Sequence, residues 1–363
     1  MNGRRTDMPS NVFITEITTQ TEEDHWHQKT QTLLRSVGIK SAISPNHLVA
    51  VKMHFGEKGN VTHLQPRHVK PIVRAVKRYQ ARPFLMDTTV LYRGKRADAV
   101  SHIELAHRHG FTLDKVDAPV IIADGLVGDN DIQIKVDGKV FDEVSIAREA
   151  LKANAVIVVS HVTGHMGTGL AATIKNLGMG LASRKGKMRQ HSSMKPEVDM
   201  ERCKNCGVCQ EWCPEDAISQ SGAAAHIDSS RCIGCGECLT VCRYDAVKYN
   251  WATESAELQR RVAEYALGAV CRHPEKFIYF NFLINVTKDC DCVGKKMKPV
   301  IPDIGILVSR DPVAADKAAV DLISAKAGKP FRELAYAHID ETVQLNHAQE
   351  IGLGRMEYSL NMV

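Results

Sequence analysis

Two cysteine runs with the same internal spacing constrain this chain more than any other feature. The runs place cysteines at Cys203, Cys206, Cys209 and Cys213, and again at Cys232, Cys235, Cys238 and Cys242. Each cysteine of the first run therefore has a counterpart 29 positions later. Such repetition predicts a duplicated unit that binds an inorganic group through thiolates.

The spacing C-x2-C-x2-C-x3-C is that of bacterial ferredoxins, in which the fourth cysteine of each run binds the other cluster. It predicts two 4Fe–4S clusters and therefore electron transfer. Zinc is the alternative, but zinc ribbons use two pairs of cysteines. The ligands predicted for the first cluster are Cys203, Cys206, Cys209 and Cys242, and those for the second are Cys232, Cys235, Cys238 and Cys213.

Composition sets the class of protein. The 363 residues are 44% hydrophobic and 25% charged, which is typical of soluble domains. No apolar run reaches the ~20 residues of a membrane helix, and the amino end shows no signal pattern. We expect a cytoplasmic protein without membrane partners, where eleven cysteines argue against disulfides. Because a basic stripe with stacking aromatics is absent, we expect no nucleic-acid binding.

Strands and helices alternate on both sides of the cysteine runs. This alternation predicts an α/β fold, a mostly parallel sheet with flanking helices. We expect residues 1–198 and 249–363 to share it, interrupted by an inserted ferredoxin-like α+β module at 199–248. Separate amino- and carboxyl-terminal domains are the alternative. The expected strands are 48–54, 83–87, 120–123, 155–160, 276–286 and 304–309, and the expected helices are 66–80, 97–109, 144–153, 254–270 and 312–325.

Several short motifs occur in a characteristic order along the chain. They include His54-Phe-Gly-Glu57, Ala123-Asp-Gly125, Ser160-His161, Gly164-His165, Ile174-Lys-Asn-Leu-Gly-Met-Gly180 and Gln190-His191. In these motifs the chain, from about Val49 to Ile323, resembles the family called domain of unknown function 362. Many members of that family carry an embedded ferredoxin segment. The resemblance implies an iron–sulfur protein with a redox role and supplies no substrate.

A glycine-rich segment follows the apolar run 155–160. Strand, glycine-rich loop and a helix starting near Ala171 form an arrangement that binds anions, with Thr168 and Lys175 as further donors. A tight turn that needs glycine for its backbone is the alternative. His161 and His165 lie beside this loop, at the edge of the sheet where sites form in α/β proteins.

The two histidines predict proton transfer or metal binding, with His54 and Glu57 converging from another strand. Loop histidines that are satisfied locally are the alternative. Asp87 and Asp124 also follow strands, and each is either a ligand or a cap of the next turn.

The sequence Asp289-Cys290-Asp291-Cys292 suggests a third site. Cys290 and Cys292 could bind an additional metal of unknown identity, with Cys271 as a further ligand. Two unreactive thiols in a turn are the alternative, because the neighbouring acids raise the thiol pKa.

The basic run between Ser183 and Lys195 is either a solvated linker, a clamp for an anionic substrate or a docking point for an acidic electron carrier.

We interpret the chain as an oxidoreductase. Its clusters would exchange electrons with an external donor or acceptor protein and deliver them to a small anionic or polar substrate near His54, His161, His165 and Lys175. A non-enzymatic electron carrier and a metal- or cluster-handling protein are the alternatives.

Overall fold

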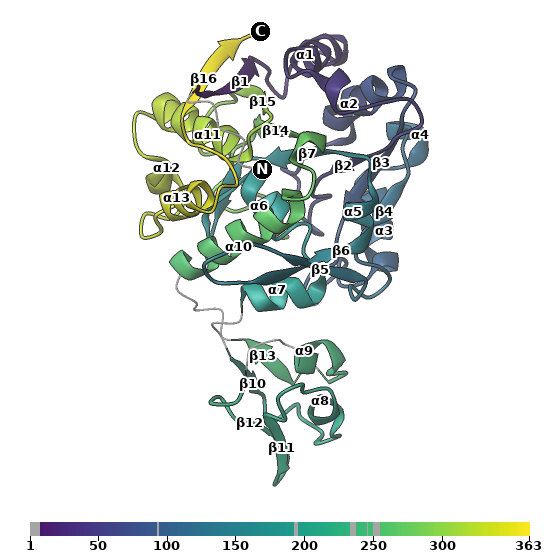
Figure 1. The fold of residues 1–363 in the computed structure, drawn as a ribbon, viewed down its shortest axis with the longest axis vertical. Helices are drawn as coiled ribbons and strands as arrows, with labels where there is room; N and C mark the ends of the chain where they lie inside the picture. The colour runs from purple at the N-terminus through teal and green to yellow at the C-terminus, as the bar shows by residue number, and fades with distance from the viewer. Residues whose placement is uncertain (1–7, 93, 192–194, 233–236, 245, 250–254) are drawn as a thin grey trace.

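The structure is a computed structural model that describes residues 8–92, 94–191, 195–232, 237–244, 246–249 and 255–363. Figure 1 shows a central sheet with helices on both faces and the cysteine-rich segment as a smaller unit beside it. None of the helices in these ranges combines the length and the apolar character that crossing a membrane requires.

The central sheet has eight strands in the order β16-β1-β15-β14-β7-β2-β3-β4. Within it β15 alone runs against the others, because it pairs antiparallel with β1 and β14 while the remaining pairs are parallel. The predicted α/β fold with a mostly parallel sheet is confirmed. The strands are β1 (Ser10–Thr15), β2 (Leu48–Lys52), β3 (Arg82–Asp87), β4 (Val120–Ile122), β7 (Ala155–His161), β14 (Phe277–Leu283), β15 (Gly305–Ser309) and β16 (Tyr358–Met362).

Strand β7 shows why the sheet is covered on both faces. Val156 and Val158 face one hydrophobic core, and Ile157 and Val159 face the other. Each fully buried side chain of this size contributes about 1.5–3 kcal/mol, so both faces need helices. The helices of the main body are α1 (Glu23–Ser36), α2 (Pro66–Arg78), α3 (Ala99–Arg108), α4 (Leu113–Val116), α5 (Arg148–Lys152), α6 (Thr173–Gly178), α7 (Arg184–Gln190), α10 (Ser255–Val270), α11 (Pro312–Ala327), α12 (Phe331–Leu334) and α13 (Thr342–Glu350), with short 3-10 turns η1 (Ile39–Ser41) and η2 (Pro274–Lys276).

The order of the strands reverses between β2 and β7. The chain runs outward from β2 through α2, β3 and α3 to β4, and then returns to place β7 on the other side of β2. Beyond the cysteine-rich segment, β14 pairs with β7. Strands from both sides of that segment therefore build one sheet, and the carboxyl ends of β2 and β7 form a topological switch point.

One predicted helix is wrong in its first half, and another begins slightly later than predicted. Residues 144–153, predicted as a helix, begin in β6 (Glu143–Ala147), which pairs with β5 (Asp131–Lys135) because Val144 and Ile146 alternate into the core. The helix expected from Ala171 starts later, at Thr173. The glycine-rich segment before it forms a hairpin of β8 (Thr163–His165) and β9 (Gly169–Ala171).

The cysteine-rich segment has its own strands, helices and small core. Its first strand pairs antiparallel with its last, so the two ends of the segment lie side by side. The predicted domain limits remain predictions, and the first strand begins before the limit at 199. The elements are β10 (Pro196–Val198), α8 (Val208–Glu211), β11 (Ile218–Ser221), β12 (Ala224–Ile227), α9 (Glu237–Val241) and β13 (Val247–Tyr249).

Asp311 joins both ends of the chain to the sheet. Its Oδ1 accepts hydrogen bonds from the N–H groups of Val313 and Ala314 at the start of α11, and its Oδ2 accepts from Ser10 and Arg355. We expect Asp311→Ala to lower the free energy of unfolding by about 2 kcal/mol, since a helix cap is lost. Denaturant unfolding would measure this. Asp311→Asn, which keeps the Oδ1 acceptor, should lose less, and equal losses would contradict the capping role.

Candidate functional site

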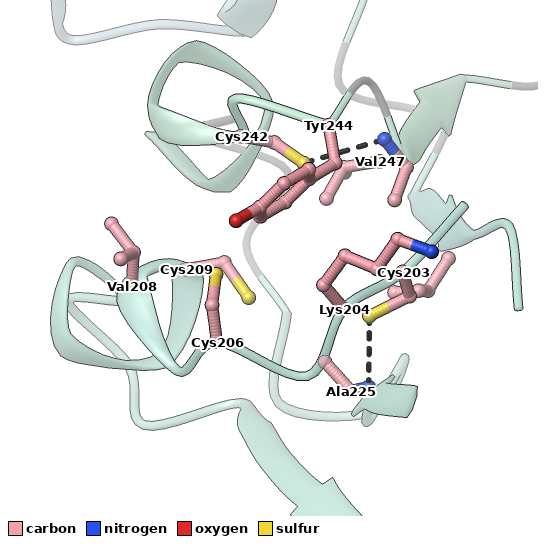
Figure 2. Close-up of a pocket in the computed structure, with 11 residues that line it drawn as sticks. Cys203, Lys204, Cys206, Val208, Cys209, Ala225, Cys242, Tyr244 and Val247 are labelled. Carbon is pink, nitrogen blue, oxygen red and sulfur yellow. Dashed lines mark hydrogen bonds between the residues drawn. The ribbon is translucent and has the colours of Figure 1, made fainter. Parts of the chain in front are cut away.

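Four cysteines line one pocket in the cysteine-rich segment. They are Cys203, Cys206, Cys209 and Cys242, the set predicted to bind the first cluster. Figure 2 shows Cys206 and Cys209 on one side of the pocket, with Cys203 and Cys242 opposite them. Three of these cysteines thus come from the first run and one from the second.

Backbone N–H groups point at the sulfur atoms in a repeated pattern. Ala217 N donates to Cys213 Sγ at 3.2 Å, and Ala246 N donates to Cys242 Sγ at 3.3 Å. These two bonds are 29 positions apart, like the cysteines themselves. Asn205 N donates to Cys203 Sγ at 3.3 Å as well. Donors of this kind stabilise thiolates and tune iron–sulfur centres.

The crowding of the thiols supplies a test of fit. Burial raises the pKa of the Cys209 thiol, and the charges of Cys206, Cys242 and Cys203 raise it further. Four thiolates can share this space only if a cationic group among them offsets their repulsion. The donor set therefore suits a metal centre.

The second predicted set is described in part. Cys213 and Cys232 are half-buried, Cys238 is buried, and Cys235 lies outside the described residues. Cys213 and Cys238 pack in the same small core as Cys203 and Cys209. The two sets thus lie close together in this unit.

In the main body, the predicted histidines gather at the switch point between β2 and β7. His54 follows β2, His161 ends β7, and His165 belongs to the β8–β9 hairpin. Lys175 lies on α6, close enough for its charge to lower the pKa of both His54 and His165. The structure therefore brings three segments of the predicted site together.

His161 differs from the prediction in its role. Nδ1 lies 2.9 Å from Asp291 Oδ2, and Nε2 lies 2.7 Å from the carbonyl oxygen of Ile284. Both ring nitrogens face acceptors, so both carry hydrogen. Burial opposes this charge, but the Asp291 carboxylate and the Ile284 carbonyl outweigh it and raise the pKa of His161. The ring holds the loop around Asp291 and is not free to exchange protons.

His54 and His165 are held in one tautomer. Nδ1 of His54 accepts from Gly56 N at 2.9 Å, and Nδ1 of His165 accepts from Gly167 N and Thr168 N. The hydrogen of each neutral ring is therefore on Nε2. Burial, with nearby positive charge, lowers the pKa of both rings well below the ordinary value. Nε2 of His54 is buried without a protein partner, as expected for a donor awaiting a ligand.

Lys175 is the cation of this site. Burial, then the charges of Arg96 and Lys52, lower its pKa to about 8. Its Nζ lies 4.0 Å from Cys290 Sγ, the one polar contact recorded for it among the described residues. Asp291 and Asp87 oppose this shift from a distance, but among the described residues no carboxylate forms an ion pair with Lys175.

Cys290 and Cys292 form a disulfide, which corrects the expectation that this chain has none. Their sulfur atoms and a nitrogen of His165 lie within 4.8 Å of one another, a group that can hold a metal ion. Cys271, predicted as a further ligand, is not in this group and donates to the carbonyl of Gly268. We call His54, His165, Lys175, Cys290 and Cys292 the switch-point site.

Asp87 and Glu57, the acids predicted near this site, form ion pairs with two cations that the sequence motifs did not indicate. Lys52 Nζ lies 3.0 Å from Asp87 Oδ1, and Arg96 Nε lies 3.1 Å from Glu57 Oε2. All four side chains are buried. Lys52 could have been noticed as a charge inside an apolar strand, whereas nothing in the local sequence marks Arg96. Asp124 accepts hydrogen bonds from Thr89 N and Oγ1, 35 positions earlier, and so ties the segment after β4 to the segment after β3.

The predicted anion site at the start of α6 is already filled. Thr173 N and Ile174 N each donate at 2.8 Å to the carboxylate of Asp316 from α11. Burial raises the pKa of Asp316 to about 6, although these donors oppose the rise. Thr168 Oγ1 donates to the carbonyl of Leu170. An internal carboxylate therefore takes the place expected for a ligand.

Most of the basic run belongs to a helix packed on the main body, and residues 192–194 lie outside the described residues. Residues 184–190 form α7, and Lys187 is buried, with its Nζ donating to Thr88 Oγ1 at 2.7 Å. Lys185 instead faces the cysteine-rich segment and lies 3.9 Å from Glu237. The run thus splits between the core of the main body and the boundary of the two units.

A family model described as a domain of unknown function, DUF362, matches residues 49–321. The chain belongs to this family. The predicted resemblance is therefore confirmed at the level of the family, and no curated protein matches the chain significantly.

Two solved structures resemble this DUF362 chain. The lactate racemase apoprotein from Thermoanaerobacterium thermosaccharolyticum has a TM-score of 0.40 and 12% identity, covering 75% of this chain and 50% of that one. A crystal structure of a Thermotoga maritima protein has a TM-score of 0.45 and 10% identity, covering 85% of this chain and 60% of that one. The chain thus spans less than two thirds of either protein, and neither similarity is close enough to transfer a function.

The His161–Asp291 pair gives a pH-dependent prediction. Because the folded pKa of His161 is raised above 6.5, its contribution is complete below the unfolded pKa and is lost as the pH rises through the folded pKa. We expect His161→Gln to cost about 3 kcal/mol of unfolding free energy near pH 6 and less at higher pH. Denaturant titrations at several pH values would measure this. His273→Gln, at an exposed pair, is the control, and a cost independent of pH would contradict the assignment.

Proposed function

We propose that this DUF362 protein carries two 4Fe–4S clusters and passes their electrons to a small anionic substrate at the switch-point site. One observation carries the cluster assignment: the pocket joins Cys203, Cys206 and Cys209 of the first run to Cys242 of the second. Two-cluster ferredoxins have this crossed ligand set, and zinc ribbons do not.

When bound, the clusters would supply one-electron transfer. The chain's own part is to hold them, with backbone N–H groups that donate to the thiolates and apolar walls that limit water. Val198, Val208 and Val247 line the pocket beside the cysteines. Fewer waters and more N–H donors both influence the potential of such centres.

The switch-point site is proposed to bind the substrate. Lys175 offers a charge that forms no ion pair with a carboxylate of the described residues, and Nε2 of His54 is a donor without a partner there. An oxygen of a carboxylate or carbonyl could accept from both groups. Lys175, whose pKa is about 8, can also give up a proton near neutral pH, which a reduction requires.

An external protein is proposed as electron donor or acceptor, in the cytoplasm. Tyr244 lines the pocket and is 45% exposed, so one wall of the first cluster would reach the surface. The same observation favours the second candidate, a non-enzymatic carrier that docks partners there. The two candidates differ in whether a small molecule oxidises or reduces the clusters.

Iron and sulfide analysis tests the clusters. Anaerobically reconstituted protein should hold about eight irons and about eight sulfides. Cys206→Ala should lose one cluster, and Cys271→Ala, at an exposed thiol outside both sets, should lose none. Zinc alone in the wild-type protein would refute the assignment.

Cluster oxidation tests the substrate site. Small carboxylic and oxo acids are mixed with the dithionite-reduced protein, and re-oxidation is followed by absorbance. We expect Lys175→Met to slow re-oxidation about 10²-fold at unchanged iron content, because a charge aimed at the substrate is lost. Lys326→Met, at an exposed position of α11, is the control. Re-oxidation by a carrier protein but by none of the acids would favour the carrier.

A further inference from the structure

We propose that Cys290 and Cys292 are a redox-active pair that exchanges with external thiols and disulfides, with Lys175 stabilising the thiolate of Cys290. This activity goes beyond the proposed electron relay and does not require the clusters.

The position of the bond in the chain argues against a structural role. The two cysteines are separated by only two positions. A disulfide stabilises a fold mainly by restricting the unfolded chain, and the restriction is least for the shortest loops. The loop is also held without it. Gly164 N donates to Thr287 O, Glu57 N donates to Asp291 O, and Asn60 Nδ2 donates to Val293 O.

The electrostatic surroundings favour a thiolate at Cys290. The negative charges of the neighbouring acids would disfavour a thiolate, but each acid is paired with a cation. Asp291 pairs with His161, and Asp289 pairs with Lys295 at 2.8 Å. The remaining charge beside the sulfur is that of Lys175, 4.0 Å away. Cys292 N also donates to Cys290 Sγ at 3.4 Å.

The two sulfurs differ in access. Cys290 is 5% exposed, whereas Cys292 is only half-buried. An incoming thiolate therefore meets Cys292 first, and Cys290 is the leaving group. A leaving thiol with a low pKa departs faster. Lys175 and the N–H group of Cys292 both lie beside Cys290 Sγ, the sulfur that leaves, and so favour its departure as a thiolate.

A metal site is the competing interpretation of the same atoms, and the geometry disfavours it. Nδ1 of His165 already accepts from Gly167 N and Thr168 N, which leaves Nε2 carrying the hydrogen. Neither nitrogen then has a lone pair free for a metal.

The exchange balances in two steps. A thiolate of an external dithiol attacks Cys292 Sγ, the Cys290–Cys292 bond breaks, and its electron pair leaves with Cys290 as a thiolate beside Lys175. In the mixed disulfide, one sulfur of the dithiol is bonded to Cys292 Sγ. The second thiolate of the dithiol then attacks that dithiol sulfur and releases Cys292. The dithiol becomes a disulfide. Of its two protons, one ends on Cys292 and the other is released to solvent, while Cys290 remains a thiolate beside Lys175.

A single tryptic peptide reports on the pair. Cleavage after Lys288 and Lys295 gives residues 289–295, which contain Cys290 and Cys292 and no other cysteine. The full-length protein is equilibrated anaerobically with mixtures of reduced and oxidised dithiothreitol, quenched, alkylated and analysed by mass spectrometry. We expect the ratio of oxidised to doubly alkylated peptide to follow the ratio of oxidised to reduced dithiothreitol, as it does for a two-electron couple. A peptide that stays oxidised in excess reductant would overturn the proposal.

Trapping and single variants test the order of attack and the role of Lys175. With reduced glutathione as the probe, the mixed disulfide trapped by acid quenching of the wild-type protein should carry glutathione on Cys292 at least tenfold more often than on Cys290. Lys175→Met should slow reduction of the wild-type pair by about tenfold, and Lys175→Arg should preserve the rate. Cys271→Ala is the control for general thiol reactivity. Equal rates in Lys175→Met and wild type would remove Lys175 from the proposal.

Two further measurements distinguish this exchange from the proposed cluster binding and from a metal site at the same residues. Cys206→Ala should leave the peptide titration unchanged, so a failure of the cluster assignment would not affect the result. A metal that co-purifies stoichiometrically and is lost only in the Cys290→Ser/Cys292→Ser protein would overturn the exchange in favour of a metal site.

Discussion

The adjacency of β2 and β7 is the constraint on which the rest of the structure depends. Both strands are apolar on both faces, and parallel strands end at the same edge of a sheet. Residues about a hundred positions apart, such as His54 and His161, therefore meet at that edge. Helices cover the sheet on both sides, so the polar groups there are largely buried and need partners.

In the part of the chain that the structure describes, some of the buried charged groups have a partner of opposite charge or hydrogen-bond donors, and others do not. This difference separates structural groups from functional ones. Asp87, Glu57 and Asp291 each face a buried cation, and Asp316 receives two backbone N–H groups. Burying a charge without such compensation would cost several kcal/mol. Within the described residues, Lys175 forms no ion pair and Nε2 of His54 has no hydrogen-bond partner. They are the groups from which ligand binding is inferred.

Local patterns in the sequence predicted much of the fold. The apolar run at β7 and the prolines that begin α2 and α11 marked these elements correctly, because their signals lie within a few residues. The helix predicted over 144–153 is correct only in its second half, α5. Its first half is a strand, because two alternating residues, Val144 and Ile146, were too short a pattern to outweigh helix-forming neighbours. The hairpin β8–β9 was missed because a glycine-rich loop has no period that distinguishes it from a turn.

By itself, the sequence determined the duplicated cysteine spacing and the alternation of strands and helices, since both are short-range properties. Only the tertiary structure decided which charges are compensated. Asp316 reaches Thr173 across 143 positions, and Asp291 reaches His161 across 130. No local pattern encodes such pairings, because burial creates the need for a partner and the fold alone determines which residue is near enough to supply it.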